Sequence, residues 1–262
     1  LIKKIEKKEK INEMEIAILG CYLPLYSLNS ILKKLANYVS KNIWFNDLIN
    51  MQIIEPIKEK KLINSIKSLN KITDKVSLQV KDQYEKNPYP RWRHTYGQLT
   101  SPFLLKLKNQ IWPNKIKIKN QFDNLKILVA GCGTGHHVCI VKDYLNSNIL
   151  AIDLSLSSLA YAKRKTDELS FGNIEYLNID ILELNKLKKK FDVIECVGVL
   201  HHMKEPMKGL KILLNLLEPH GVIKLGLYSE KARQHIVQVR EFIKKNKFKN
   251  TTDGIRDCRQ SI

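Results

Sequence analysis

Three glycines, Gly131, Gly133 and Gly135, are spaced two residues apart directly after a short apolar run. Glycine adopts a positive φ without strain and, because it lacks a Cβ, lets the backbone approach a ligand closely. The run Ile127–Ala130 has the uninterrupted apolar character of a strand buried on both faces, and helical spacing begins near His136. A strand, a glycine turn and a helix in this order predict a cradle for a nucleotide-like cofactor.

The glycine spacing also restricts the kind of cofactor. The dinucleotide fingerprint G-x-G-x-x-G requires a small residue at position 136, where this chain has His136. The difference favours a nucleoside without a pyrophosphate, such as S-adenosylmethionine (SAM), over NAD. Taken alone, the glycines are also compatible with an ordinary tight turn between a strand and a helix.

Two aspartates follow successive predicted strands. Asp153 ends a strand about 20 residues after the first glycine, where a carboxylate can accept hydrogen bonds from both ribose hydroxyls. Asp180 ends the next strand, where a carboxylate can accept from an adenine amine while Leu154 or Ile181 flanks the ring. The alternatives are a helix N-cap for Asp153, a role for which Ser155 competes, and a solvent-exposed turn for Asp180.

A histidine pair, His201 and His202, follows the next predicted strand in the sequence G-V-L-H-H. Imidazole titrates near neutral pH, so either ring could act as a general base; the alternative is a packing or capping role. His136 and His137, in the first turn after the glycine loop, could likewise line the site or occupy the helix surface. No Asp, Glu, His and Cys set has metal-ligand spacing, so no metal site is expected.

Strands and helices alternate from Leu125 onward. The predicted strands are 125–130, 148–153, 174–179, 191–197 and 222–228, and the predicted helices are near 136–145, 155–168, 204–217 and 229–246. This alternation predicts an α/β fold, a Rossmann-like and mostly parallel sheet flanked by helices. A turn is predicted at 219–221, and the last helix is expected to close the core.

The first 82 residues contain almost no glycine, and apolar residues recur there at helical spacing. We predict an N-terminal helical region over 1–82, with turns near Pro24, Asn46–Asp47 and Pro56. Residues 83–120 form a connecting segment that begins Q-Y-E-K-N-P-Y-P-R-W. Its aromatic rings could cover a cofactor, because a sulfonium attracts π faces, or could pack as a strap between two subdomains.

Composition limits the remaining possibilities. The net charge of +19 would suit RNA or a membrane surface, but only seven of the 45 basic residues are arginine. Phosphate recognition usually recruits arginine, so we favour a general lysine bias over nucleic-acid binding. Five cysteines without a C-x-x-C pair, and an interrupted apolar stretch at 16–28, predict a cytoplasmic protein without membrane contact.

Together these motifs resemble those of class I SAM-dependent methyltransferases. The resemblance rests on V-A-G-C-G-T-G (129–135), A-I-D-L-S (151–155), N-I-D (178–180) and F-D-V-I-E-C-V-G-V-L-H-H (191–202), and it covers roughly residues 122–230. It implies that SAM is the cofactor, with its methionine part at the glycine loop, its ribose at Asp153 and its adenine near Asp180. The implied cofactor-binding residues are Ala130, Gly131, Cys132, Gly133, Gly135, Asp153, Leu154, Asp180, Ile181 and Val197, and the candidate catalytic residues are His201 and His202.

A narrower resemblance concerns the ends of the chain. The segments 83–92 and 227–233 (L-Y-S-E-K-A-R) are similar to those of methyltransferases with tetratricopeptide repeats upstream, which implies protein partners at the N-terminal helices. Two features depart from the family pattern. Val129 stands where the family often has an acid that helps hold the SAM amino group through water. No further strands follow Tyr228, so we expect the SAM-binding domain, 121–262, to be truncated at its C-terminus.

Three functions stay open at this point. The first is methyl transfer from SAM to an unidentified acceptor. G-V-L-H-H stands in place of the family's Asn/Asp-Pro-Pro-Tyr-type turn, which weakly favours an oxygen or carbon acceptor over an amine. The second is a non-catalytic SAM-binding module that interacts with other proteins, and the third is an RNA methyltransferase.

Overall fold

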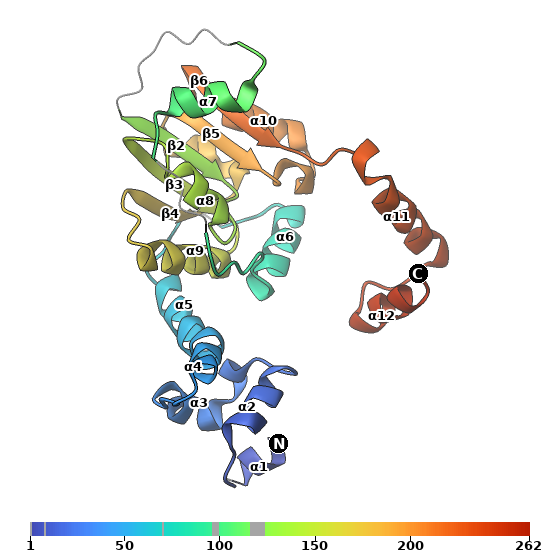
Figure 1. Ribbon diagram of the computed structural model, residues 1–262. Helices are drawn as coiled ribbons and strands as arrows, with labels where there is room; N and C mark the ends of the chain where they lie inside the picture. Colours follow the sequence, from blue (N-terminus) through green and yellow to red (C-terminus); the bar gives the residue numbers. More distant parts are fainter. Residues whose placement is uncertain (1, 8, 70, 96–99, 116–123) are drawn as a thin grey trace.

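The computed structural model describes residues 2–7, 9–69, 71–95, 100–115 and 124–262 (Figure 1). Its sheet has the strand order β1-β4-β3-β2-β5-β6, and every neighbouring pair is parallel. The strands are β1 (Lys67–Ser68), β2 (Leu125–Ala130), β3 (Ser147–Asp153), β4 (Ile174–Asn178), β5 (Phe191–Val197) and β6 (Leu217–Gly226). The predicted Rossmann-like α/β fold is confirmed.

Each face of the sheet carries its own apolar core, as expected of parallel strands buried on both sides. Ile127 and Val129 point to one face, and Leu128 and Ala130 point to the other. The first face is covered by α7 (Phe103–Ile111), α8 (His136–Val141) and α9 (Leu156–Glu168). The second face is covered by α10 (Pro206–Asn215) and the 3₁₀ segment η3 (Ile181–Leu187).

The N-terminal region is helical, as predicted, and encloses a separate apolar cluster. Its elements are α1 (Ile2–Glu6), α2 (Glu13–Gly20), η1 (Leu25–Ser27), α3 (Asn29–Ala36), α4 (Ile43–Ile49), the π-helical segment η2 (Asn50–Ile54) and α5 (Glu55–Ile63). Two predicted turns are wrong. Asn46 and Asp47 lie inside α4. Pro56 lies at the start of α5, directly after the π-helical segment η2, and therefore stands inside one continuous helical run over 43–63.

The predicted domain boundaries are crossed by several contacts. The short strand β1, which the sequence did not predict, pairs with β4, and α6 (Lys75–Lys86) packs against α9. The unpredicted helix α7 lies within the connecting segment 83–120 and contributes Phe103 to the core. The proposed boundary between 120 and 121 lies outside the described residues.

The C-terminal part differs from the prediction in three ways. The predicted turn at 219–221 is wrong, because these residues form a bulge in β6 between the pairs Phe191–Leu217 and Val193–Val222. The predicted long helix is divided into η5 (Lys231–Arg233) and α11 (Gln234–Asn246). None of the α11 residues is buried, and the helix stands away from the sheet (Figure 1), so it does not close the core. The polar tail forms α12 (Thr252–Gln260).

An ion-pair cluster joins the N-terminal helices to the sheet domain. The Arg164 side chain of α9 is 2% exposed and lies 3.0 Å from carboxylate oxygens of Glu55 and Glu59 on α5, and of Glu168 on its own helix. Glu59 also pairs with Arg91 at 3.2 Å. Because buried charges are costly unless they are paired, this cluster fixes α5 against α9.

Candidate active site

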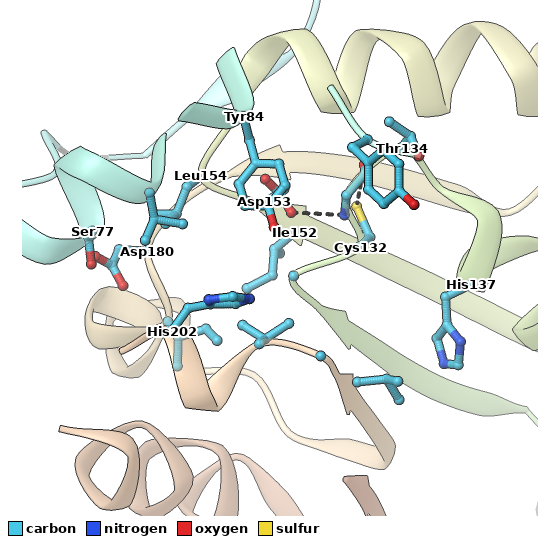
Figure 2. Close-up of a pocket in the computed structure, with 18 of the residues that line it drawn as sticks. Ser77, Tyr84, Cys132, Thr134, His137, Ile152, Asp153, Leu154, Asp180 and His202 are labelled. Atoms are coloured by element: carbon cyan, nitrogen blue, oxygen red, sulfur yellow. Dashed lines mark hydrogen bonds between the residues drawn. The ribbon is translucent and has the colours of Figure 1, made fainter. Parts of the chain in front are cut away.

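A cavity of about 330 Å³ lies at the carboxyl ends of the central strands (Figure 2). Nine of the sequence-predicted site residues line it: Gly131, Cys132, Gly133, Asp153, Leu154, Asp180, Ile181, Val197 and His202. Three predicted residues, Ala130, Gly135 and His201, are not part of the lining. The sheet topology explains why these residues lie together, since the carboxyl ends of parallel strands lie at one edge of the sheet.

The three loop glycines all have positive φ, but each has a different reason to be glycine. A Cβ on Gly131 (φ 74°) would lie 2.4 Å from Val199, and a Cβ on Gly135 (φ 81°) would lie 2.6 Å from Ala162 of α9. Gly135 therefore packs the loop against α9 instead of contacting the cavity. Gly133 (φ 52°) has open space where its Cβ would be, with only the Tyr89 carbonyl oxygen at 3.7 Å.

Asp153 is held by the backbone of the glycine loop. Gly133 N–H donates to its Oδ2 at 2.8 Å, and Ser155 N–H donates to Oδ1 at 2.9 Å. Ser155 is the N-cap of α9, accepting from Ser158 N–H, so the N-cap alternative for Asp153 is wrong. Burial raises the pKa of Asp153, although these N–H donors oppose the shift. Each carboxylate oxygen keeps acceptor capacity for a ligand in the cavity.

Asp180 is 4% exposed, so the exposed-turn alternative is wrong. Its Oδ1 accepts from Leu182 N–H at 2.9 Å, which caps η3 and orients the carboxylate. Leu154 and Ile181 line the same part of the cavity. The arrangement offers a flat apolar slot with one acceptor at its edge.

Residues 87–92, which we call the strap, cross over the glycine loop. Pro90 carbonyl oxygen accepts from Thr134 Oγ1, and Trp92 Nε1 donates to Thr134 carbonyl oxygen at 2.9 Å. Tyr161 hydroxyl donates to Trp92 carbonyl oxygen. The strap also supplies Tyr89 to the cavity wall. The segment therefore packs against the glycine loop, as the strap interpretation predicts, and it also lines the cavity. That its rings cover a cofactor stays a prediction.

Several lining residues were not predicted from the sequence. Ser77 and Val80 come from the part of α6 that lies in the predicted helical region 1–82, whereas Tyr84, on the same helix, belongs to the aromatic segment 83–120 whose rings were expected to cover a cofactor. The three residues share one helix face, and an amphipathic pattern is the only sequence signal that Ser77 and Val80 carry. Burial raises the pKa of Tyr84, with Tyr228 and Asp153 nearby.

The charge of the lining is unlike that of the whole chain. Two carboxylates line the cavity, Asp153 and Asp180, and no lysine or arginine stands among its described lining residues. The chain as a whole has 45 lysine and arginine residues. The cavity therefore suits a neutral or cationic ligand better than one that carries phosphate.

The two predicted catalytic histidines have different surroundings. His202 lines the cavity, whereas the His201 ring stacks on Tyr228 with centroids 3.9 Å apart. Arg233 continues this column, with its Cζ 3.8 Å from the Tyr228 centroid. Burial lowers the pKa of His202; it also lowers the pKa of His201, with His202 and Arg233 adding to that shift.

A second polar group lies beneath the glycine loop. The carboxylate of Glu195 on β5 is 1% exposed and contacts Nε2 of His137, which itself lines the cavity. Tyr144 hydroxyl donates to Glu195 Oε1 at 2.7 Å, and Lys224 Nζ lies 3.6 Å from Oε2. Burial alone would raise the pKa of Glu195, but His137, Tyr144 and Lys224 hold it below its ordinary value.

The described ranges contain neither a group of metal-ligand residues nor a membrane-spanning helix. Within them, no group of three or more His, Cys, Asp or Glu side chains is arranged to hold a metal ion. None of the helices in that part of the chain combines the length and apolar character needed to cross a bilayer.

A family model described as a methyltransferase domain matches residues 121–257, more than half of the chain. The chain belongs to this methyltransferase-domain family. The matched region contains the glycine loop, both aspartates and the histidine pair, and the resemblance read from those motifs is confirmed at the level of the family. An upstream tetratricopeptide-repeat region stays a prediction.

Relatives of the chain include proteins with different described functions. An uncharacterised Synechococcus protein, syc1184_c, is 36% identical over 129 residues, covering 47% of this chain and 30% of that protein. A Schizosaccharomyces pombe mitochondrial ubiquinone biosynthesis O-methyltransferase is 31% identical over 116 residues, covering 42% and 40%. A Campylobacter jejuni tRNA U34 carboxymethyltransferase is 26% identical over 215 residues, covering 75% and 70%. The chain thus spans less than half the length of the first two.

Proposed function

We propose that this chain is a SAM-dependent methyltransferase that binds its cofactor in the cavity between the glycine loop and the strap. The observation that carries the proposal is the charge of the lining, which contains the carboxylates of Asp153 and Asp180 and no lysine or arginine among its described residues. SAM combines a ribose diol, an adenine and a cationic sulfur, and these match acceptors, an apolar slot and aromatic faces. A dinucleotide would instead bring a pyrophosphate against two carboxylates.

The strand order supports an assignment for each part of the cofactor. Asp180 follows β4, Asp153 ends β3 and the glycine loop follows β2, in the order β4-β3-β2 across the sheet. We assign adenine to the slot beside Asp180, ribose to Asp153 and the methionine part to the loop. When bound, SAM supplies a methyl group on a positively charged sulfur. The protein contributes by aligning the acceptor with that group and excluding water, and orientation alone can supply about 7–11 kcal/mol.

For the acceptor we favour an oxygen or carbon atom. His202 lies in the lining, and its lowered pKa keeps the imidazole neutral at physiological pH, ready to take a proton from a hydroxyl. The relative named as an ubiquinone biosynthesis O-methyltransferase supports this chemistry. His201 faces Tyr228 instead, so we assign the base to His202.

Cofactor binding is tested by calorimetry on the full chain with SAM, S-adenosylhomocysteine and NAD. We expect the first two to bind and NAD to give no heat. Asp153→Ala removes the ribose acceptor and should weaken SAM binding by about 10-fold or more. If the intact protein gives no heat with SAM, or if NAD binds as well as SAM, the proposal fails.

Turnover is tested by incubating the protein with methyl-labelled SAM and fractionated lysate. Label in small molecules, lost in His202→Ala, would support an oxygen or carbon acceptor. SAM binding without label in any fraction would support the alternative of a non-catalytic module that interacts with proteins through the N-terminal helices. A cytoplasmic location stays a prediction.

A second candidate function is methyl transfer to RNA. It is favoured by the net charge of +19 and by the relative named as a tRNA U34 carboxymethyltransferase, which covers three quarters of this chain. Filter binding with total tRNA at two salt concentrations distinguishes it, because phosphate contacts make RNA affinity fall steeply with salt. Absence of salt-dependent binding would remove this candidate.

A further inference from the structure

A buried carboxylate without an assigned task lies in the middle of the sheet. Glu195 occupies a central position of β5 and is 1% exposed. An ionised carboxylate in such a place costs several kcal/mol unless charged or hydrogen-bonding partners compensate it. The methyl-transfer chemistry proposed above makes no use of it.

The partners of Glu195 come from three different elements. His137 belongs to α8, Lys224 to β6, and Tyr144 to the segment that follows α8. Tyr144 is 3% exposed, and the Lys224 side chain is 38% exposed. Of the three, only His137 lines the cavity, with 22% of its side chain exposed. The carboxylate therefore reaches the cavity through the imidazole alone.

The position of His137 along the sheet edge indicates which part of a ligand it meets. The strand order β4-β3-β2-β5 places Asp180, Asp153, the glycine loop and then the His137–Glu195 pair in succession. Figure 2 shows Asp180 on one side of the cavity and His137 on the other, with Asp153 and Cys132 between them. A ligand whose adenine and ribose meet the two aspartates therefore extends its other end toward His137.

We propose that His137, oriented by Glu195, binds the amino-acid end of the cofactor. This inference rests on the proposed function, because it assumes that the ligand is SAM or a close analogue. The ionised Glu195 accepts a hydrogen bond from Nε2, which fixes the ring, and within the described part of the chain Nδ1 has no hydrogen-bond partner. The α-amino-carboxylate group of SAM is the part of the ligand that needs such a partner. Glu195 is thus a positioning residue, and His137 is the binding residue.

The same pair gives a physical account of Val129. The strand register places Glu195 directly beside Val129, on the neighbouring strand. A carboxylate is therefore present at this level of the sheet, although position 129 itself is apolar. We infer that the charge has moved one strand across and acts through an imidazole.

The test compares two ligands that differ only at the proposed contact. 5′-Methylthioadenosine retains the adenine, ribose and sulfur of SAM but lacks the amino-acid part. His137→Ala should weaken S-adenosylhomocysteine binding by about 10- to 100-fold and leave methylthioadenosine binding within about twofold. His235→Ala, at an exposed position of α11, is the matched control and should change neither affinity.

Glu195→Gln examines the positioning step, with Glu175→Gln at an exposed position of β4 as its control. Glu195→Gln should also weaken S-adenosylhomocysteine selectively, and the double variant with His137→Ala should bind no worse than His137→Ala, because the two residues act in series. Thermal unfolding without ligand separates loss of folding from loss of recognition. If Glu195→Gln does not fold, the His137→Ala comparison still decides.

Two outcomes would overturn the inference. One is an equal loss of affinity for both ligands in His137→Ala, which would show a general effect on cavity shape. The other is unchanged affinity for both. If the wild-type protein binds neither ligand, the proposed function itself fails, and that result is distinguishable from the first two.

Discussion

Gly133 and Gly135 share a left-handed backbone but have opposite surroundings. Gly135 faces Ala162 of α9 at a distance that no Cβ can occupy, whereas Gly133 faces open space at the cavity. The same left-handed backbone conformation thus serves packing at Gly135 and ligand access at Gly133. Sequence spacing identifies both glycines but cannot separate these two tasks.

Alanine substitutions distinguish the packing role of Gly135 from the ligand-access role of Gly133. Gly135→Ala should lower the free energy of unfolding by about 2–4 kcal/mol, because it adds a clash to the cost of a left-handed alanine. Gly133→Ala should lower it by only about 1–2 kcal/mol but should weaken SAM binding, since its Cβ enters the cavity. Urea unfolding and calorimetry measure the two effects, and a larger loss of stability in Gly133→Ala would contradict the assignment.

The raised pKa of Asp153 predicts a pH dependence of cofactor binding. A protonated carboxyl loses acceptor capacity, so SAM affinity should be constant near neutral pH and fall as the pH drops through this pKa. Because burial raises the pKa, the loss should begin at a higher pH than for an ordinary aspartate. Calorimetry from about pH 7 to pH 4.5 measures it. Asp153→Asn should bind more weakly at neutral pH and lose this step, whereas a step that persists in Asp153→Asn would assign it to another group.

Among the elements, the contact between α5 and α9 depends on one buried guanidinium. Arg164 faces Glu55 and Glu59 across the interface, and the arginine side chain is almost completely buried. An amphipathic pattern predicts that both helices exist, but the pairing that joins them connects residues about 100 positions apart. This is why the sequence predicted a helical region without predicting its attachment to the sheet.

Arg164→Met tests this attachment. It keeps most of the side-chain volume but removes the buried partner of Glu55 and leaves Glu59 only its pair with Arg91, so we expect a loss of about 3–5 kcal/mol in the free energy of unfolding. Arg256→Met on α12 is the control, because Arg256 is 72% exposed and its pair with Asp253 should contribute less than about 1 kcal/mol. Equal stabilities of the two variants would show that the α5–α9 cluster contributes little.

The predicted elements of the sheet domain were largely correct because, in this part of the sequence, the spacing of apolar residues and the residue types at turns and helix caps indicate the same elements. The strand β2 ends in an uninterrupted apolar run, and Ser155 caps α9 as its type suggests. The failures have a common cause. The amphipathic period predicted a helix where α11 lies but not that this helix stands apart from the sheet. The predicted helical region over 1–82 covered only the first part of α6 and did not predict its place beside the cavity. The spacing of apolar residues in a local stretch indicates whether it forms a helix or a strand, but it does not indicate which part of the protein that element packs against.

At the scale of the whole molecule, the chain packs as two bodies, the N-terminal helices and the sheet domain, each with its own apolar core. The N-terminal helices enclose one apolar cluster, while the sheet carries the others and the cavity (Figure 1). The strap and α6 belong by sequence to the N-terminal half but lie against the glycine loop. A cofactor should therefore stabilise a part of the molecule that is not contiguous in sequence.

Hydrogen exchange with and without SAM measures which segments the cofactor stabilises. We expect slower exchange in the glycine loop, after β3 and β4, and in residues 84–92, with no change in α1–α4. At a SAM concentration 100 times the dissociation constant, the gain in global stability should be about 2.7 kcal/mol. Protection spread evenly over α1–α4 would contradict the division into two bodies.

The position of Trp92 has a practical consequence. Of the three tryptophans, Trp44 and Trp112 are 76% and 81% exposed, while Trp92 is 8% exposed and lies 5.6 Å from the ring of His136 beside the glycine loop. Its indole is shielded from water, so its fluorescence is expected at shorter wavelength than that of the two surface indoles. The molecule therefore carries a built-in optical reporter at the loop, readable without any label and before any acceptor is known.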